Sequence, residues 1–120
     1  MRLILLALAT VAALVCATGA SGAAGIAPPT AGRFEKIFVA RANGYAAGHG
    51  ERIRFVRADC LEGSSGDYLC AYTTRRPGGG TTCRLMHAVW TPGATRPFRV
   101  VLAGRTPVCG SVRHVLASLD

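Results

Sequence analysis

The sequence has little acidic charge and few aromatic residues. Asp and Glu number 6 against 14 Lys and Arg, which gives a net charge of +8, and Phe, Trp and Tyr make up only 7% of the 120 residues. Half of the residues are apolar and the mean hydropathy is +0.31, which excludes a disordered chain. We therefore expect one folded domain with a mainly aliphatic core, because the chain is too short for a second.

The motifs of common enzymes and metal sites are missing as well. The sequence contains no C-x-x-C pair and no paired histidines, so neither a zinc site nor a redox-active dithiol is expected. Gly78 to Gly80 lack the lysine and the helix that follow a phosphate-binding loop. Several carboxylates lie next to turns and form no pair suited to acid–base catalysis. We predict no catalytic residue, no metal and no cofactor.

The histidines keep a second interpretation open. His49 lies between two glycines, His87 lies within a predicted strand, and His114 lies in the last predicted helix. Histidines in such positions are more often surface or packed residues than catalytic bases. The alternative function is a small secreted enzyme that uses His87 or His49 as its base.

Residues 1–23 have the three-part pattern of a secretory signal peptide. Arg2 precedes an uncharged apolar run, which ends in a series of small residues. We expect cleavage after Ala20 or Ala23. An uncleaved membrane anchor and lipidation of Cys16 are the alternatives for this segment.

Cleavage leaves a flexible spacer over residues 24–30 and a single disulfide-stapled domain over residues 31–120. The domain is predicted to be secreted or otherwise extracytoplasmic, with no stable membrane span after cleavage. An even number of cysteines in a small exported domain is typical of a disulfide framework. The four cysteines that remain are Cys60, Cys70, Cys83 and Cys109.

Hairpin geometry favours one of the three pairings that four cysteines allow. The segment from Gly63 to Asp67 has the composition of a turn and lies midway between Cys60 and Cys70. A turn there brings these two cysteines opposite each other. The favoured pairing is therefore Cys60 with Cys70 and Cys83 with Cys109.

Periodicity predicts an α+β fold. Helices are expected over residues 33–47 and 111–119, with Thr30 and Ser111 as their N-caps. Four strands are expected between the helices, over residues 52–60, 68–75, 82–91 and 98–104, with a bulge at Phe55 and Val56. The predicted architecture is an N-terminal helix, a four-stranded antiparallel meander and a C-terminal helix, with the helices packed on one sheet face.

Alternation along the strands assigns side chains to the two faces. We expect the helices to cover an apolar face, with Trp90 packed near Val112 or Leu116. That face comprises Leu69, Ala71, Met86, Ala88, Trp90, Phe98, Val100 and Leu102. The other face, which we call the mixed face, comprises Cys70, Tyr72, Cys83, Leu85, His87, Val89, Arg99, Val101 and Arg105.

Two surfaces are candidates for binding a partner. On the mixed face the candidate residues are Tyr72, Leu85, His87 and Val89. The second surface, which we call the arginine edge, comprises Arg52, Arg54, Arg75 and Arg76. A strongly basic surface attracts anionic partners. We expect an unknown protein or an anionic envelope component, and no nucleic acid, because the protein is exported and has no platform of stacking aromatics.

Several short motifs resemble those of small exported bacterial disulfide-containing proteins of uncharacterised function. The resemblance covers about residues 60–119 and implies export and disulfide bonds, but no activity. The motifs are Tyr68-Leu69-Cys70-Ala71-Tyr72, Cys83-Arg84-Leu85-Met86, Trp90-Thr91-Pro92, Leu102-Ala103-Gly104-Arg105 and Cys109-Gly110-Ser111. The predicted function is a secreted, non-catalytic binding or interaction module, and the roles considered are an inhibitor and an envelope-binding protein.

Overall fold

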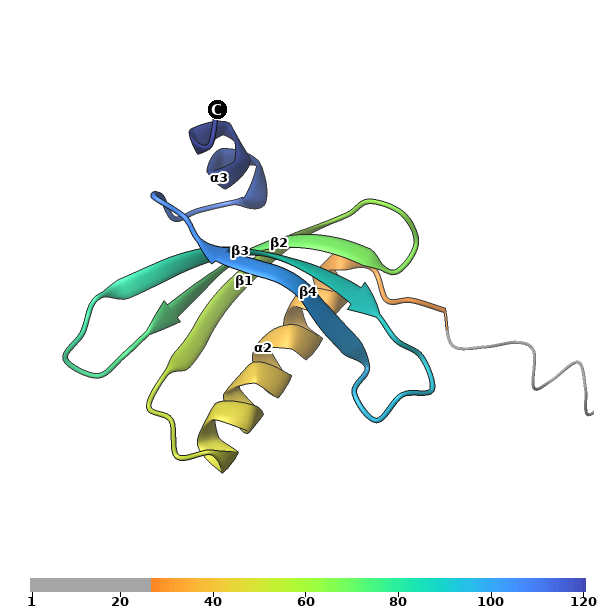
Figure 1. Ribbon diagram of the computed structural model, residues 1–120, viewed down its shortest axis with the longest axis horizontal. Helices are drawn as coiled ribbons and strands as arrows, with labels where there is room; N and C mark the ends of the chain where they lie inside the picture. The colour runs from red at the N-terminus through yellow and green to blue at the C-terminus, as the bar shows by residue number, and fades with distance from the viewer. Residues whose placement is uncertain (1–26) are drawn as a thin grey trace, which may run out of the picture.

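The structure is a computed structural model that describes residues 27–120. The predicted signal peptide, residues 1–23, therefore lies outside the described residues. The elements are α2 (Ala31–Gly48), β1 (Arg54–Glu62), β2 (Asp67–Arg75), β3 (Thr81–Trp90), β4 (Phe98–Arg105) and α3 (Val112–Ser118) (Figure 1). The α+β class and the order of helix, four strands and helix are confirmed.

The four strands form one antiparallel sheet in the order β1-β2-β3-β4, so β1 and β4 are its two edges. The register of β1 against β2 shifts between Phe55 and Arg57, as expected for the predicted bulge. A second shift occurs in β4, because Val100 and Leu102 pair with the consecutive residues Ala88 and His87. Val101 is therefore an extra residue on the β4 edge.

Both helices begin at the predicted caps. The Thr30 hydroxyl accepts a hydrogen bond from the Arg33 amide, and the Ser111 hydroxyl accepts one from the His114 amide. These bonds satisfy backbone donors that the first turn of a helix leaves free. The sequence pattern thus defines the start of each helix to within two residues.

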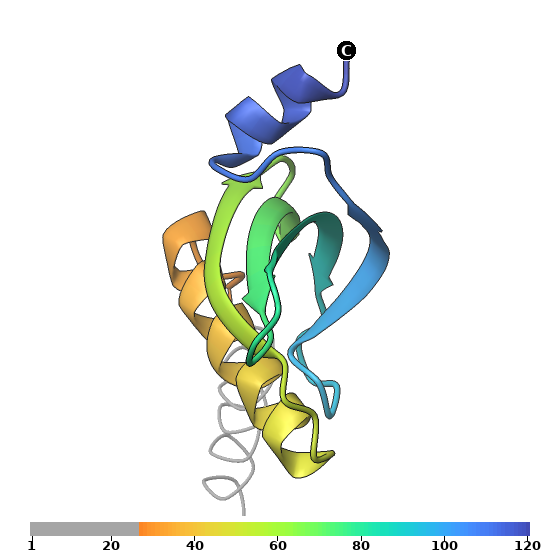
Figure 2. The ribbon, with the colours of Figure 1, turned by 90° about the vertical axis from the view of Figure 1, so that its left-hand side faces the viewer.

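The structure corrects the placement of both helices on one sheet face. Helix α2 packs on the face that carries Tyr68, Cys70 and Tyr72, whereas α3 packs on the face that carries Leu69 and Ala71. Figures 1 and 2 show the two helices against different parts of the sheet. Helix α2 runs along β1, and α3 lies near the end of β1 that leads into β2. The sheet is therefore covered in part on each face.

The prediction is wrong in the phase of β2 and, beyond the bulge at Val101, in the phase of β4, where Leu102 is opposite His87. Cys70 is opposite Met86, and Leu69 is opposite His87. Cross-strand partners share a face. Leu69 was predicted to share a face with Met86, but it lies on the opposite face. Trp90 packs with the α2 cluster and not near Val112 or Leu116, which belong to the cluster on the other face.

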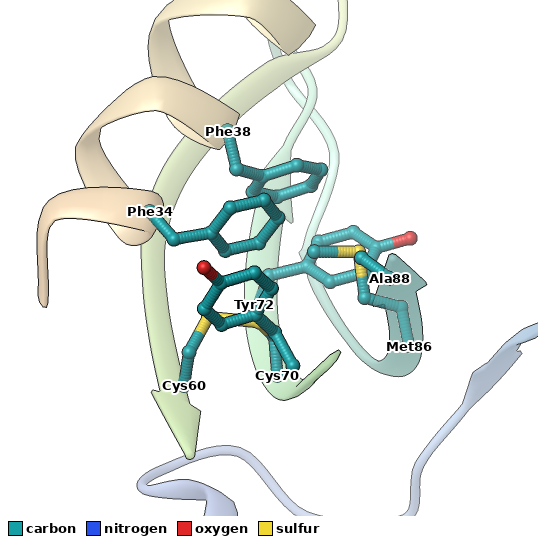
Figure 3. Close-up of a cluster of buried hydrophobic side chains, with 8 residues drawn as sticks. Phe34, Phe38, Cys60, Cys70, Tyr72, Met86 and Ala88 are labelled. Carbon is teal, nitrogen blue, oxygen red and sulfur yellow. A yellow bond between two sulfur atoms is a disulfide. The ribbon is translucent and has the colours of Figure 1, made fainter. Parts of the chain in front are cut away.

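The main core is aromatic and not mainly aliphatic. The Phe34 ring stacks on Tyr68 with 4.1 Å between ring centroids, and Phe38 meets Phe55 and Tyr72 edge to face. Figure 3 shows Phe34 and Phe38 pointing from α2 towards the disulfide and Tyr72. The few aromatic residues are thus concentrated under one helix.

Tyr68 also links the sheet to the chain before α2. Its side chain is buried, and its hydroxyl donates a hydrogen bond to the Pro29 carbonyl. Burial, together with the nearby Glu62 carboxylate, raises the pKa of Tyr68 to about 12. The hydroxyl is therefore kept as a donor at any physiological pH.

Both predicted disulfide bonds are present. Cys60 and Cys70 are cross-strand partners in β1 and β2, and both are buried in the α2 cluster. Cys83 at the start of β3 is bonded to Cys109, which precedes α3. The first bond is part of the core, and the second holds the C-terminal segment to the sheet.

Side chains of α2 occupy the outer edge of β1. The Asn43 side chain donates to the Phe55 carbonyl (2.9 Å) and accepts from the Phe55 amide (2.8 Å). The Glu35 carboxylate accepts from the Cys60 amide at 2.8 Å. Asn43 binds both the N–H and the C=O of Phe55, as a neighbouring strand would, so these outward-facing backbone groups of β1 have partners.

We expect Asn43→Ala to lower the free energy of unfolding by about 1 to 3 kcal/mol, because it leaves the partly buried N–H and C=O of Phe55 without partners. Urea unfolding monitored by circular dichroism would measure the change. Lys36→Ala, at an exposed position of the same helix, is the control and should change stability by less than about 0.5 kcal/mol. Equal effects of the two substitutions would contradict a structural role for the Asn43 side chain.

We expect replacement of Cys60 and Cys70 together by serine to leave a folded protein that is about 2 to 3 kcal/mol less stable, because the bond closes a loop with a sequence separation of 10. Denaturant unfolding would measure this loss. Peptide mapping of the native protein provides the companion test, and a peptide that links Cys60 to Cys83 or Cys109 would refute the pairing.

Candidate interaction surfaces

The arginine edge forms a cluster in the structure. Arg54 is the cross-strand partner of Arg75, and Arg52 and Arg76 follow at the same end of the sheet. All four are exposed. Within residues 27–120 the contact of His87 with Asp67 is the only one of a basic with an acidic side chain at salt-bridge distance, so no carboxylate in this part of the chain is paired with the cluster.

The acidic side chains are used for other contacts. Glu35 accepts from the backbone of β1, and the Asp59 carboxylate accepts from the Val112 amide at 2.7 Å, at the start of α3. Asp67 accepts from the Ser64 hydroxyl at 2.8 Å. These three carboxylates bind backbone amides and neighbouring polar side chains, so they do not offset the positive charge that attracts an anionic partner.

The predicted site on the mixed face is not assembled. Tyr72 is buried in the α2 cluster, on the opposite face from Leu85 and His87. Burial raises the pKa of Tyr72, although the nearby Arg84 acts in the other direction. Leu85 is half-buried in the α3 cluster, and Val89 is half-buried as well. Of the four residues, His87 alone presents a polar group to solvent.

His87 belongs to a small polar network with Asp67 and Ser64. The His87 Nε2 atom is 2.8 Å from Asp67 Oδ1, and the Ser64 hydroxyl donates to Asp67 Oδ2. A serine nucleophile needs the histidine between itself and the carboxylate. Here the carboxylate lies between the other two groups, so Ser64 is not activated by His87.

His49 is positioned by the end of α2. Its ring stacks on Tyr45 with 3.9 Å between centroids, and its Nδ1 atom lies 2.8 Å from the Tyr45 carbonyl oxygen. Both contacts are with Tyr45 in the last turn of α2, so they fix the His49 ring at the C-terminal end of the helix. Of the two histidines in the alternative interpretation, His49 lies against Tyr45 and His87 lies against Asp67.

An apolar groove of about 1160 Å³ lies between α2 and the start of β4. We call it the α2–β4 groove. Its floor includes Phe38, Phe55 and Phe98, its helix side includes Tyr45, and its outer side includes Val100. Tyr45 is 54% exposed and Val100 is 44% exposed, so large apolar surfaces meet solvent along both rims.

No family model, curated protein or solved structure matches this chain. The family resemblance of the short motifs therefore stays a prediction.

The groove has a basic rim. Arg41 on α2 and Arg96 in the β3–β4 hairpin contribute to its lining, against the single carboxylate of Glu51. Arg99 also borders the groove, but it is opposite Val89, so its side chain lies on the other face of the sheet. An apolar surface with cations around it suits an apolar segment flanked by acidic residues. Sequence reasoning missed this site because it assigned Phe98 and Val100 to a face fully covered by helices.

Two structural findings bear on other kinds of site. Residues 27–120 contain no group of three or more His, Cys, Asp or Glu side chains arranged to hold a metal ion. In the same part of the chain, none of the helices combines the length and apolar character needed to cross a membrane.

The polar network predicts a pH dependence. Hydrogen bonds from Ser64 and His87 lower the pKa of Asp67 from its ordinary value of 3.8. A depressed folded-state pKa stabilises the protein above the unfolded pKa, and this contribution is lost as the pH falls through the folded value. We expect Asp67→Asn to lower Tm at neutral pH and to have a smaller effect well below pH 3.8.

Thermal melting of both proteins across this pH range would measure the difference. Glu51→Gln, at an exposed carboxyl group, is the control. A difference between wild type and Asp67→Asn that persists unchanged in acid would show that ionisation of Asp67 has no part in stability.

Proposed function

We propose that this protein is an exported, non-catalytic binding module that takes up an acidic protein segment in the α2–β4 groove. The observation that carries the proposal is the groove itself, which is apolar, open and lined by aromatic residues from both a helix and the sheet. Contiguous exposed apolar surface of this kind is a feature of interaction sites in small proteins.

The charge distribution supports an acidic partner. Arg41 and Arg96 lie on the rim of the groove, and the arginine edge adds further cations where β1 begins and β2 ends. Such a field accelerates encounter with an acidic protein and disfavours basic ones. The apolar lining favours a protein segment over a highly charged envelope polymer, which would leave the aromatic floor without a partner.

The covalent framework supports export. Two disulfide bonds in a small domain are typical of extracytoplasmic proteins, in line with the signal peptide that residues 1–23 predict. An inhibitor is one role that suits a rigid, disulfide-stapled domain, because a preorganised surface binds with little loss of conformational entropy.

A displayed library of random peptides, about ten residues long, tests the proposal. We expect the oxidised protein to enrich sequences that combine aliphatic residues with Asp or Glu. Val100→Asp should abolish the enrichment, because it places a carboxylate on the apolar rim among residues that must be desolvated on binding. Deep sequencing of the selected pools would measure the enrichment.

Val56→Asp is a matched control. Val56 is 45% exposed against 44% for Val100, and it lies on β1 outside the groove. The control variant should select the same sequences as the wild type. Selection of no consensus by the wild type, or equal loss of selection in both variants, would overturn the proposal.

A further inference from the structure

The backbone of β4 has an open outer edge. In an antiparallel ladder hydrogen-bonded pairs alternate with pairs whose N–H and C=O groups point away from the partner strand. The Thr91 amide donates to the Pro97 carbonyl at one end of the β3–β4 ladder, and the Thr106 amide donates to the Cys83 carbonyl at the other.

Hydrogen-bonded and non-hydrogen-bonded pairs alternate from each of these two bonds towards the middle of β4. With Val101 as the extra residue, the alternation from the two ends gives the same assignment. The residues whose N–H and C=O point away from β3 are Phe98, Val100, Ala103 and Arg105.

The two edges of the sheet differ in whether side chains bind their outward-facing backbone groups. On β1, Asn43 and Glu35 supply partners for outward-facing backbone groups. Within residues 27–120, no comparable side chain is hydrogen-bonded to the outer groups of β4. Figure 2 shows β4 on the side of the sheet away from α2, so that helix cannot supply them.

The side chains of β4 do not protect its edge either. The run from Val100 to Gly104 has no charged residue, and Leu102 is 71% exposed. Natural edge strands usually carry a charge or a proline in such a run, because an open apolar edge is a template for strand pairing. The bulge at Val101 interrupts the edge without covering it.

We infer that an extended segment of an acidic protein partner adds to β4 as a fifth strand, with one row of its side chains lying over the α2–β4 groove. This inference rests on the proposed function and specifies how the groove is used. Main-chain hydrogen bonds would supply affinity, and the groove would select the side chains.

Charge argues for this occupant over a second copy of the chain. Arg99 and Arg105 lie at the two ends of the open edge, and Arg96 lies in the preceding hairpin. A second copy would bring the same arginines, and a second excess of positive charge, to the seam. Flanking carboxylates on a different protein would instead meet these cations.

The geometry also predicts which partner residues face the groove. Val100 is opposite Ala88 and Ala103 is opposite Met86, and both of these partners belong to the α2 cluster. A residue of the added strand that exchanges hydrogen bonds with Val100 or Ala103 therefore places its side chain on the α2 side. The same partner residue supplies both the backbone donor and the groove contact.

The probe is the peptide Glu-Glu-Val-Thr-Val-Thr-Val-Glu-Glu, titrated into the oxidised protein. Its valines are expected to face the groove and to donate their N–H groups to β4. N-methylation of the three valines should weaken binding about tenfold or more, because it removes those donors. N-methylation of the two threonines, whose amides point away from β4, should have little effect.

Amide hydrogen exchange measured by NMR locates the bound peptide. Saturation should slow exchange at Phe98, Val100, Ala103 and Arg105, whereas Arg99, Leu102 and Gly104 should be protected with or without peptide. Substitution of all four glutamates by lysine should reduce binding, and the loss should shrink at high salt. Ala103→Pro removes one outward donor from the protein and should weaken binding, and Ala103→Val, which keeps the N–H, is its matched control.

The peptide arms remain decisive if Ala103→Pro does not fold. Equal binding of the two N-methylated peptides would overturn strand addition while leaving the groove as a binding site. Failure of the parent peptide to bind or to protect β4, although library selection still depends on Val100, would likewise overturn strand addition alone. Concentration-dependent protection of β4 without peptide would identify a second copy as the occupant and overturn the acidic partner. Loss of both peptide binding and library selection would remove the proposed function as well.

Discussion

The pairing of α2 with the outer edge of β1 is the constraint on which the rest of the structure depends. Asn43 binds both backbone groups of Phe55, and Glu35 binds the Cys60 amide. These bonds hold the helix alongside one edge and aim Phe34 and Phe38 at the Cys60–Cys70 disulfide and its neighbours. The aromatic core, the bulge in β1 and the cap at Thr30 all belong to this single docking arrangement.

One helix in this position cannot cover a four-stranded sheet. Neighbouring strands are about 4.8 Å apart, and a helix with its side chains is about 10 Å across, so α2 covers the β1 side and contacts β4 at Phe98, while the rest of β4 stays open. The α2–β4 groove is the consequence. Helix α3 does not fill it, because its buried residues Val112 and Val115 pack on the opposite face. The exposed rim at Tyr45 and Val100 therefore follows from where α2 is anchored.

The sequence predicts the local features well because each depends on neighbouring residues: the caps at Thr30 and Ser111, the turn after Gly63 and the pairing of Cys60 with Cys70. It does not predict the phase of β2. The run from Tyr68 to Tyr72 is apolar at every position, since one face meets α2 and the other meets α3, and alternation has no polar marker there. The role of Asn43 is not predicted either, because its partner at Phe55 is a tertiary contact with no local signal in the sequence.

The difference between features set by neighbouring residues and features set by tertiary contacts also explains why the candidate site is hard to predict. The arginine edge was predicted from charge alone and does assemble, since Arg54 and Arg75 are cross-strand partners. The groove cannot be predicted without knowing which part of the sheet the helices leave open. Two of the six carboxylates hold the helices in place, Glu35 for α2 and Asp59 for α3, and both accept backbone amides instead of pairing with arginines. Internal docking of the helices thus leaves positive charge and an apolar strand edge on the outside, and this combination gives the surface its complementarity to an acidic, extended partner.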